Sequence, residues 1–346
     1  MKVAMIGPDV GAKGGVASVI QNFKEHFDES TIQISYYTTW KDGNKVDHYL
    51  RSVFVILIFP IFLFYKKISL VHLHVAQKGS FYRKSILLLI ATVFKLPTIF
   101  HMHASQFDEF YASQNKVKKK YISWVFQRAT KVVALSEEWQ KYYQSIGVSH
   151  CEVIENSVLI SKKNDYSLHA KKIVSFGRLG QRKGTYDILT AAKEIEKDYP
   201  EYQFILYGDG DIEQVKKQIE AQNIVNVKVG GWIKEQEKIR VLKETCLHLL
   251  PSYQEGMPMA ILETMANGIP NISSTVGGIP QVIKDHSNGL LVRPGDTKGL
   301  IHALKVFLSQ SEFRREVSEA SYQTIYTRFS LNNYHEKWII LYKTTT

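Results

Sequence analysis

Residues 251–263 read Pro-Ser-Tyr-Gln-Glu-Gly-Met-Pro-Met-Ala-Ile-Leu-Glu and join a predicted strand to a predicted helix. The strand is the apolar run 246–250, after which the chain breaks at Pro251 and turns through Glu255-Gly256. The helix is expected to begin at Pro258, because proline suits the first helical position. Met257 is then the N-cap, and methionine caps poorly. The first helical amides therefore lack an obvious side-chain partner, and such a helix start attracts an anion, typically a phosphate.

Two carboxylates belong to this stretch. Glu255 lies in the turn and Glu263 in the helix, about 12 Å further along if the rise is helical throughout. They are too far apart to share a proton, and they suit a role in holding two parts of one extended ligand around a phosphate. The alternative is a loop charge and a solvated helix face, because charged residues are mostly at the surface.

Composition describes an ordinary globular protein. The 346 residues suggest two domains, 45% are hydrophobic and 22% are charged. The two cysteines are far apart in sequence and fit a reducing cytosol, and residues 2–7 read as a first strand and not as a signal peptide. The net charge of +11 points to nucleic acid, an anionic membrane surface or a phosphorylated substrate. Nucleic acid is the least favoured, because no zinc spacing or RNA-binding aromatic signature accompanies the charge.

Strands and helices alternate along both halves of the chain, which predicts parallel sheets in an α/β protein. The expected architecture is two doubly wound, Rossmann-like domains facing a central cleft. The expected boundaries are 1–165 for the N-terminal domain, 166–328 for the C-terminal domain, and 329–346 for a helix that packs back on the N-terminal domain. The clear strands are 2–7, 70–75, 98–103, 131–135, 173–176, 203–207, 225–229, 246–250, 271–274 and 289–292.

Ligands of parallel sheets bind at the carboxyl ends of the strands, so the polar groups there are the candidate site residues. His72, His74, His101 and His103 belong to strands 70–75 and 98–103, although their spacing alone does not make a metal site. The glycine-rich loop 177–184 places Arg178 and Lys183 after a strand. A guanidinium and an ammonium commonly hold phosphate, although a basic surface loop is an equal alternative.

Two segments of the first half bear on membranes. Residues 53–65 are almost all apolar but short for a transmembrane helix, and they include Pro60. They form either a buried helix or a helix at a membrane interface. Residues 116–128 form a helix with a basic start and aromatic side chains, which is either a solvated face or a surface that meets anionic lipid.

Together these motifs resemble the retaining family-4 glycosyltransferases, which have the GT-B fold. The resemblance covers nearly the whole chain, in order, and its combination of motifs is specific. The matching motifs are Glu255-x7-Glu263 with Gly256 and Pro258, Gly177-Arg178-Leu179 with Lys183-Gly184, Gly277-Gly278-Ile279-Pro280, Gly289-Leu290-Leu291-Val292, Gly14-Gly15-Val16, Val71-His72-Leu73-His74 and His103-Ala104-Ser105.

The resemblance implies a nucleotide-sugar donor held mainly by the second domain, with Arg178 and Lys183 on its diphosphate and Glu263 on its ribose. Glu255 is then expected to hold the donor sugar, with His103 contacting it from the first domain. The remaining expected donor contacts are Gly14, Gly15, Gly177, Trp232, Ile233, Gly256, Met257, Pro258 and Met259. The family's usual Pro-Asn-Gly-Val-Asp is here Glu155-Asn156-Ser157-Val158-Leu159, and Tyr253-Gln254 replaces its usual Ser or Thr; both departures concern sugar preference.

The implied enzyme is a retaining hexosyltransferase that uses a UDP-sugar and needs neither metal nor cofactor, since its own cations stabilise the leaving diphosphate. The apolar run 53–65 and the basic helix 116–128 suggest that the acceptor meets the first domain and is a glycan or a polyprenyl-diphosphate-linked glycan of cell-surface polysaccharide assembly, at the cytoplasmic face of the membrane. No nucleic-acid partner is expected. Two alternatives remain: a non-catalytic GT-B partner of an active transferase, and a nucleotide-sugar epimerase. A dehydrogenase is disfavoured, because residues 7–15 lack the dinucleotide spacing.

Overall fold

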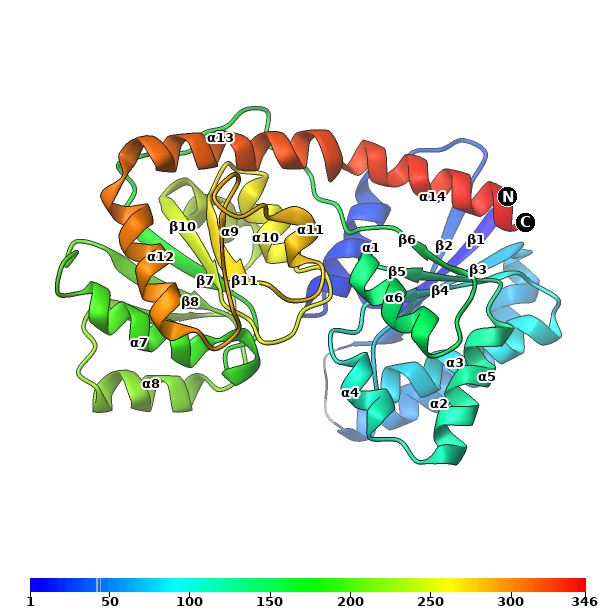
Figure 1. Ribbon diagram of the computed structural model, residues 1–346. Helices are drawn as coiled ribbons and strands as arrows, with labels where there is room; N and C mark the ends of the chain where they lie inside the picture. Colours follow the sequence, from blue (N-terminus) through cyan, green and yellow to red (C-terminus); the bar gives the residue numbers. More distant parts are fainter. Residues whose placement is uncertain (42, 44) are drawn as a thin grey trace. The chain divides into compact units, whose positions relative to one another are not determined.

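The computed structural model describes residues 1–41, 43 and 45–346, with the side chains of 45–49 excepted. The chain divides into two compact units: unit 1 is Met1–Ser157 with Leu331–Thr346, and unit 2 is Val158–Ser330 (Figure 1). The first boundary lies earlier than the expected 165/166, because Val158 pairs with Ser330 and its N–H donates to the carbonyl of Phe329. Each unit holds a six-stranded parallel sheet with helices on its faces, so the two doubly wound domains are confirmed.

The sheet of unit 1 has the strand order β2-β1-β3-β4-β5-β6. Two of these strands, β2 and β6, were not identified from the sequence. β2 is half-buried and mostly polar, and β6 has only three residues, so neither presents a long apolar run. The strands are β1 (Lys2–Pro8), β2 (Gln33–Trp40), β3 (Leu70–Val75), β4 (Thr98–Met102), β5 (Lys131–Ala134) and β6 (Cys151–Val153).

The two faces of this sheet differ in chemistry. One face is apolar and is covered by α2, α3 and α5. There Phe100 of β4 packs against Phe81 of α3 and Phe126 of α5. The other carries histidines and is covered by α1 and α14, whose Phe23 and Trp338 rings touch. The helices are α1 (Gly15–His26), α2 (Lys45–Lys66), α3 (Gly79–Val93), α4 (Phe107–Ala112), α5 (Lys116–Arg128), α6 (Glu137–Ser145) and α14 (Leu331–Thr345).

The sheet of unit 2 has the order β12-β11-β10-β7-β8-β9. Its strands are β7 (Lys172–Phe176), β8 (Gln203–Tyr207), β9 (Val227–Gly231), β10 (Thr245–Leu250), β11 (Asn271–Ser274) and β12 (Leu290–Val292). β9 begins two residues later than expected, because Val225 is exposed in the loop before it. The chain reverses its direction of winding between β7 and β10, and ligands of such sheets bind at this reversal.

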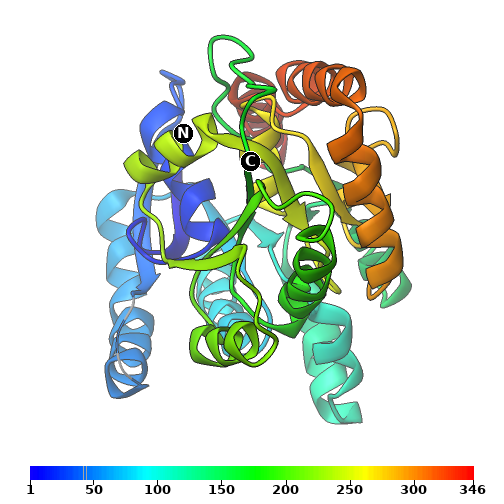
Figure 2. The same ribbon diagram turned by 90° about the vertical axis from the view of Figure 1, so that its left-hand side faces the viewer.

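Helices cover both faces of this second sheet. Helices α7 and α8 (green) and α12 (orange) lie on one face in Figure 2, and α7 packs against both of the others. The helical segments are η1 (Gln181–Lys183), α7 (Thr185–Ile195), α8 (Ile212–Ala221), α9 (Glu235–Lys243), α10 (Met259–Met265), α11 (Ile279–Val282), α12 (Thr297–Ser309) and α13 (Ser311–Arg328). The expectation for α10 was wrong by one residue: it begins at Met259, and Pro258, in an extended conformation, is its N-cap.

Candidate functional site

The loops after β7 and β10 are bound to each other where the strand order reverses. The backbone N–H of Tyr253 donates to the carbonyl of Arg182 at 2.8 Å, and the Arg182 guanidinium donates to the carbonyl of Gln254 at 3.2 Å. Gly184 has φ 68°, and a Cβ on it would lie 2.2 Å from the carbonyl oxygen of Pro251. A glycine is therefore required for this approach, which brings Lys183 to the turn that carries Glu255.

Lys183 and Glu255 form a buried ion pair. Lys183 Nζ lies 2.5 Å from Glu255 Oε1, and the two side chains are 14% and 5% exposed. Ser252 Oγ donates to the same oxygen at 2.7 Å. Neither the loop-charge alternative for Glu255 nor the surface-loop alternative for Lys183 describes this arrangement. The sequence analysis did not single out Ser252, although its position three residues before Glu255 in a turn is a local signal.

Glu263 is also paired. Its carboxylate contacts the ammonium of Lys238 on α9, and both side chains are largely buried. The Lys238 ammonium lies 5.0 Å from the centre of the Phe176 ring, so it bridges α9, α10 and the end of β7. A solvated helix face is therefore wrong for Glu263. No sequence signal marks Lys238, because its contact joins elements 25 residues apart.

Arg178 differs from Lys183 in its exposure. Its side chain is 67% exposed and lies 3.7 Å from Asp209 Oδ2, in the loop after β8. That loop is joined to the Arg178 loop by the N–H of Leu179, which donates to the Asp209 carbonyl at 2.7 Å. Asp209-Gly210-Asp211 is an Asp-x-Asp sequence, so the residues themselves do not exclude a divalent cation.

The remaining predicted residues of unit 2 lie in the same loops or directly after β9. Trp232 is 45% exposed, whereas Ile233 packs against the small core of Val174 and Phe176. Gly256 and Met257 are buried in the turn before α10, and the Gly256 carbonyl accepts from the N–H of Gly278 at 2.6 Å. Among the residues that the structure describes, none caps the start of α10 with its side chain, and the predicted phosphate contact at Pro258 and Met259 stays a prediction.

In unit 1 the predicted residues gather at β1, β3 and β4. Gly14 is the N-cap of α1 with φ 122°, and Gly15 is its first residue. His103 follows β4, and its Nε2 lies 2.9 Å from Nδ1 of His74. Burial lowers the pKa of His103 to about 3, so its imidazole is neutral near pH 7.

His72, His74 and His101 form a compact cluster within unit 1 instead of lying at open strand ends. Their ring nitrogens come within 4.8 Å of one another, and all three rings are buried. His72 Nε2 lies 3.1 Å from His101 Nδ1, and His72 Nδ1 lies 2.7 Å from the Tyr342 hydroxyl. Burial lowers the pKa of each ring, so all three are neutral near pH 7. The hydrogen bonds of His72 join β3 to β4 and to α14, and His74 bonds His103.

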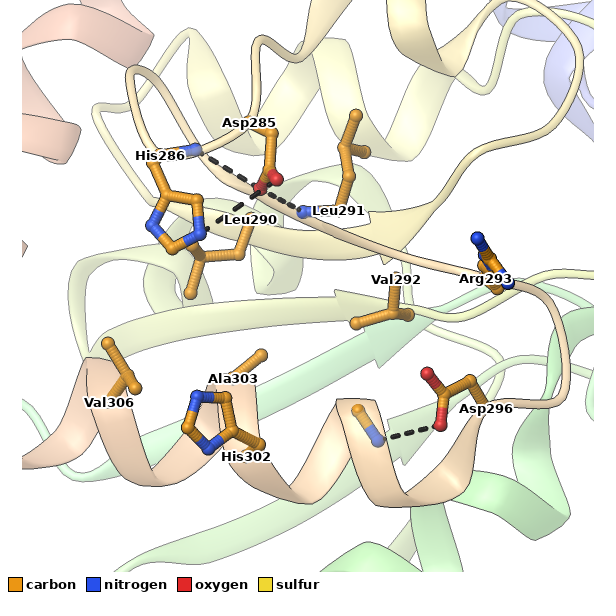
Figure 3. Close-up of a pocket in the computed structure, with 11 residues that line it drawn as sticks. Asp285, His286, Leu290, Leu291, Val292, Arg293, Asp296, His302, Ala303 and Val306 are labelled. Carbon is orange, nitrogen blue, oxygen red and sulfur yellow. Dashed lines mark hydrogen bonds and ion pairs between the residues drawn. The ribbon is translucent and has the colours of Figure 1, made fainter.

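A separate cavity of about 320 Å³ lies in unit 2 between β12 and α12 (Figure 3). Asp285 and Asp296 belong to its lining, and both accept backbone N–H bonds: Asp285 from Leu291 and Asp296 from Gly299. None of the predicted donor residues lines it. We assign it no role in the candidate site.

Two family models match consecutive parts of the chain. The model described as "Glycosyltransferase Family 4" matches residues 13–162, and the one described as "Glycosyl transferases group 1" matches residues 159–324. The chain belongs to the family 4 glycosyltransferases. The GT-B fold expected from the resemblance is confirmed by the two sheets and by solved structures of similar fold.

Three relatives bear on this glycosyltransferase. It is 25% identical to an "Uncharacterized 41.2 kDa protein in cps region" of Klebsiella pneumoniae, over 96% of its own length and 97% of that protein. It is 29% identical to the amylovoran biosynthesis glycosyltransferase AmsK of Erwinia amylovora, over 56% and 51% of the two chains. It is 28% identical to an α-1,4-N-acetyl-D-galactosaminyltransferase of Campylobacter jejuni, named as acting on an undecaprenol-diphosphate-linked glycan, over 64% and 61%.

Two solved structures show the same fold. Sucrose-phosphate synthase from Thermosynechococcus elongatus superposes with a TM-score of 0.83 at 15% identity, over 99% of this chain and 98% of that one. HepE from Anabaena, in complex with UDP-glucose, superposes with a TM-score of 0.79 at 16% identity, over 99% and 100%.

Proposed function

We propose that the glycosyltransferase moves a hexose-type sugar from a UDP-sugar to a glycan or polyprenyl-diphosphate-linked acceptor, with retention of configuration, in the assembly of a cell-surface polysaccharide. The observation that carries this proposal is the buried Lys183–Glu255 pair at the reversal of the unit 2 sheet. The names of the Erwinia and Campylobacter relatives support the acceptor class, and the UDP-glucose complex of HepE supports the donor class.

The proposed chemistry follows from charge. When the bond to the anomeric carbon breaks, the diphosphate leaves with additional negative charge. Arg178 at the start of the loop after β7 and Lys183 near its end stabilise that charge in the transition state. Electrostatic stabilisation of this kind is commonly the largest catalytic contribution. The acceptor attacks from the side of the leaving group, whose phosphate helps to take the acceptor's proton, so no general base is assigned.

In this proposal Glu255 holds hydroxyls of the donor sugar and Glu263 holds the ribose. Both carboxylates already have a lysine partner, which limits their rotation. The positive charges of the two lysines also offset the negative charges of the carboxylates, which would otherwise repel a diphosphate. The site is therefore charge-balanced before the donor arrives, with Arg178 as its exposed cation.

The test is nucleotide release from a panel of UDP-, GDP- and ADP-sugars. We expect slow, acceptor-free hydrolysis of one UDP-sugar by the wild type and its loss in Glu255→Gln, with Glu237→Gln, an exposed carboxylate of α9, as the matched control. Hydrolysis that persists in EDTA supports metal independence. If no donor is hydrolysed and neither UDP nor GDP raises the melting temperature, the non-catalytic partner becomes the better description.

The proposal places the enzyme at the inner face of the cell membrane, through helix α2. Val55, Phe59 and Leu63 of this helix face the core. The opposite side exposes Phe54, Leu57, Ile61, Phe64 and Tyr65, each at least 52% exposed. Among the described residues no helix is long and apolar enough to span a membrane. An exposed apolar ridge beside the cations Arg51, Lys66 and Lys67 suits the surface of an anionic bilayer.

A further inference from the structure

His74 and His103 form a hydrogen-bonded pair at the carboxyl ends of β3 and β4. His74 Nδ1 lies 2.9 Å from His103 Nε2. The ring centroids are 5.0 Å apart and the ring planes differ by 24°, so the rings meet nearly edge to edge, as a straight N–H···N bond requires. The sheet itself sets this geometry, because β3 and β4 pair in parallel and the His103 N–H donates to the Val75 carbonyl at 2.7 Å.

The direction of this hydrogen bond fixes the protons of both rings. In a neutral imidazole one nitrogen carries the proton and the other is an acceptor. If His74 donates from Nδ1, its Nε2 is a lone pair and the His103 proton is on Nδ1. If His103 donates from Nε2, the His74 proton is on Nε2 and His103 Nδ1 is an acceptor. The direction therefore decides whether His103 offers its ligand a donor or an acceptor.

The surroundings of His74 Nε2 distinguish the two cases. This atom is buried and has no hydrogen-bond partner among the described residues. Lys84 of α3 lines the same cavity as His74, a space of about 580 Å³ at the carboxyl ends of β1 and β3. Burial lowers the pKa of His74 most, and the neighbouring histidines and the Lys84 charge lower it further, so the ammonium lies near this ring.

Lys84 is a buried cation that needs lone pairs. Its side chain is 2% exposed, and among the described residues no carboxylate pairs with it. Its ammonium donates to Thr39 Oγ1 at 2.5 Å, while the Thr39 hydroxyl donates its own proton to the Gly7 carbonyl at 3.0 Å. An ammonium has three N–H donors and no acceptor. Its field therefore favours a lone pair at His74 Nε2 and disfavours an N–H dipole there.

We infer that His74 and Lys84 hold the proton of His103 on Nδ1, so that His103 presents an N–H donor to its ligand. Both are positioning residues that act through His103, which is partly exposed and whose Nδ1 has no partner among the described residues. The inference rests on the proposed function, because His103 is the expected contact of unit 1 with the donor sugar. It implies that the sugar atom opposite His103 is an acceptor, such as a hydroxyl or carboxylate oxygen.

The experiment is NMR spectroscopy of the ligand-free full chain with ¹⁵N-labelled histidine. Correlations between the ring protons and the ring nitrogens show which nitrogen of each ring is protonated, and the His103→Asn spectrum identifies the His103 signals. We expect the Nδ1–H form of His103 in the wild type. In Lys84→Met the ratio of the Nδ1–H to the Nε2–H form should fall by about 10-fold or more, the usual scale for losing an interaction with a charged group. Lys24→Met, an exposed lysine of α1, is the control and should leave the ratio unchanged.

A cycle of variants tests whether His74 acts through His103. His74→Phe keeps an aromatic ring and removes the hydrogen bond, so it should reduce donor hydrolysis. The double variant His74→Phe/His103→Phe should lose no more activity than His103→Phe alone, because His74 then has nothing to position. Losses that multiply in the double variant would show that His74 acts independently of His103, against the inference.

Two spectra would also overturn the inference. The Nε2–H form of His103 in the wild type would reverse the bond and make His103 an acceptor. An unchanged ratio in Lys84→Met would show that Lys84 does not set the proton position. Lys84→Met keeps the length of the side chain, and melting temperatures establish that each variant is folded. The spectra need no turnover, so a failure of the proposed sugar transfer is detected separately.

Discussion

Lys183 and Glu255 show how a buried pair couples stability to activity at the level of single residues. Removing the ammonium leaves a carboxylate that is 5% exposed without its cation. We expect Lys183→Ala to lower the free energy of unfolding by about 3 kcal/mol or more. The double variant Lys183→Met/Glu255→Gln, which buries no charge, should recover much of that stability without recovering donor hydrolysis. Urea titrations and nucleotide release measure the two effects, and a double variant no more stable than Lys183→Ala would contradict the argument.

Arg178 should separate the same two quantities. Its guanidinium is exposed and 3.7 Å from Asp209, so Arg178→Ala should cost less than about 1 kcal/mol of stability. If Arg178 stabilises the leaving diphosphate, turnover should fall by about 10²- to 10³-fold. Arg315→Ala, which removes an exposed arginine paired with Glu312 on α13, is the matched control. Near wild-type turnover in an Arg178→Ala/Lys183→Ala variant would show that the electrostatic account of catalysis is wrong.

Gly277 packs closely against the backbone of the Glu255 turn. Its φ is 56°, and a Cβ there would lie 2.1 Å from the carbonyl oxygen of Glu255. Gly231 has a similar φ of 69°, but no atom of the described residues lies within 4 Å of the position that a Cβ would take there. Gly231→Ala should therefore lower the free energy of unfolding by about 1 kcal/mol through backbone strain alone. Gly277→Ala has the same strain and also displaces the Glu255 turn. We expect only Gly277→Ala to reduce donor hydrolysis strongly; equal activity of the two variants would show that the turn tolerates the shift.

At the scale of elements, helix α2 has two apolar faces, of which one packs in the core and the other is exposed. Its buried face belongs to the core of unit 1, and its exposed face is apolar. The sequence analysis treated a buried helix and an interfacial helix as alternatives for residues 53–65. The structure combines a core-packed side with an exposed apolar side, because a helix repeats every 3.6 residues and a continuous apolar run fills its whole circumference.

The exposed side of α2 should control membrane contact. Phe54→Gln/Leu57→Gln removes two side chains that are 64% and 68% exposed, so the fold should be preserved. Each contributes about 2 kcal/mol if it is buried in lipid, and the fraction that floats with anionic liposomes should fall accordingly. Leu159→Gln, an exposed leucine of unit 2, is the control. Wild-type protein that stays entirely out of the liposome fraction would remove the membrane proposal.

At the scale of the whole molecule, unit 1 is completed by the last helix of the chain. The Trp338 ring of α14 stacks on His72 with centroids 4.3 Å apart, and the Tyr342 hydroxyl bonds the same histidine. A fragment 1–157 lacks α14 and exposes the part of the histidine-bearing face that α14 covers. Unit 2, in contrast, is one continuous segment, Val158–Ser330.

We therefore expect the fragment 158–330 to unfold cooperatively on heating, and the fragment 1–157 to lack a cooperative transition. Within the full chain, Trp338→Ala should cost about 3–5 kcal/mol, the usual range for a fully buried aromatic side chain. Circular dichroism of the fragments and urea unfolding of the variant test both statements. A cooperative melt of fragment 1–157 at the temperature of the full chain would show that α14 is dispensable.

The sequence by itself determined the α/β class, the two doubly wound domains and most strand positions, because apolar periodicity and glycine-rich turns are local signals. It also singled out Lys183, Glu255 and Glu263 through their motif.

Tertiary structure alone decided their partners: Lys238 reaches Glu263 from another helix, and Lys183 and Glu255 are 72 residues apart. It likewise decided that the histidines are enclosed beneath α14. Such contacts depend on which strands become neighbours in a sheet, and no local sequence pattern encodes which strands pair.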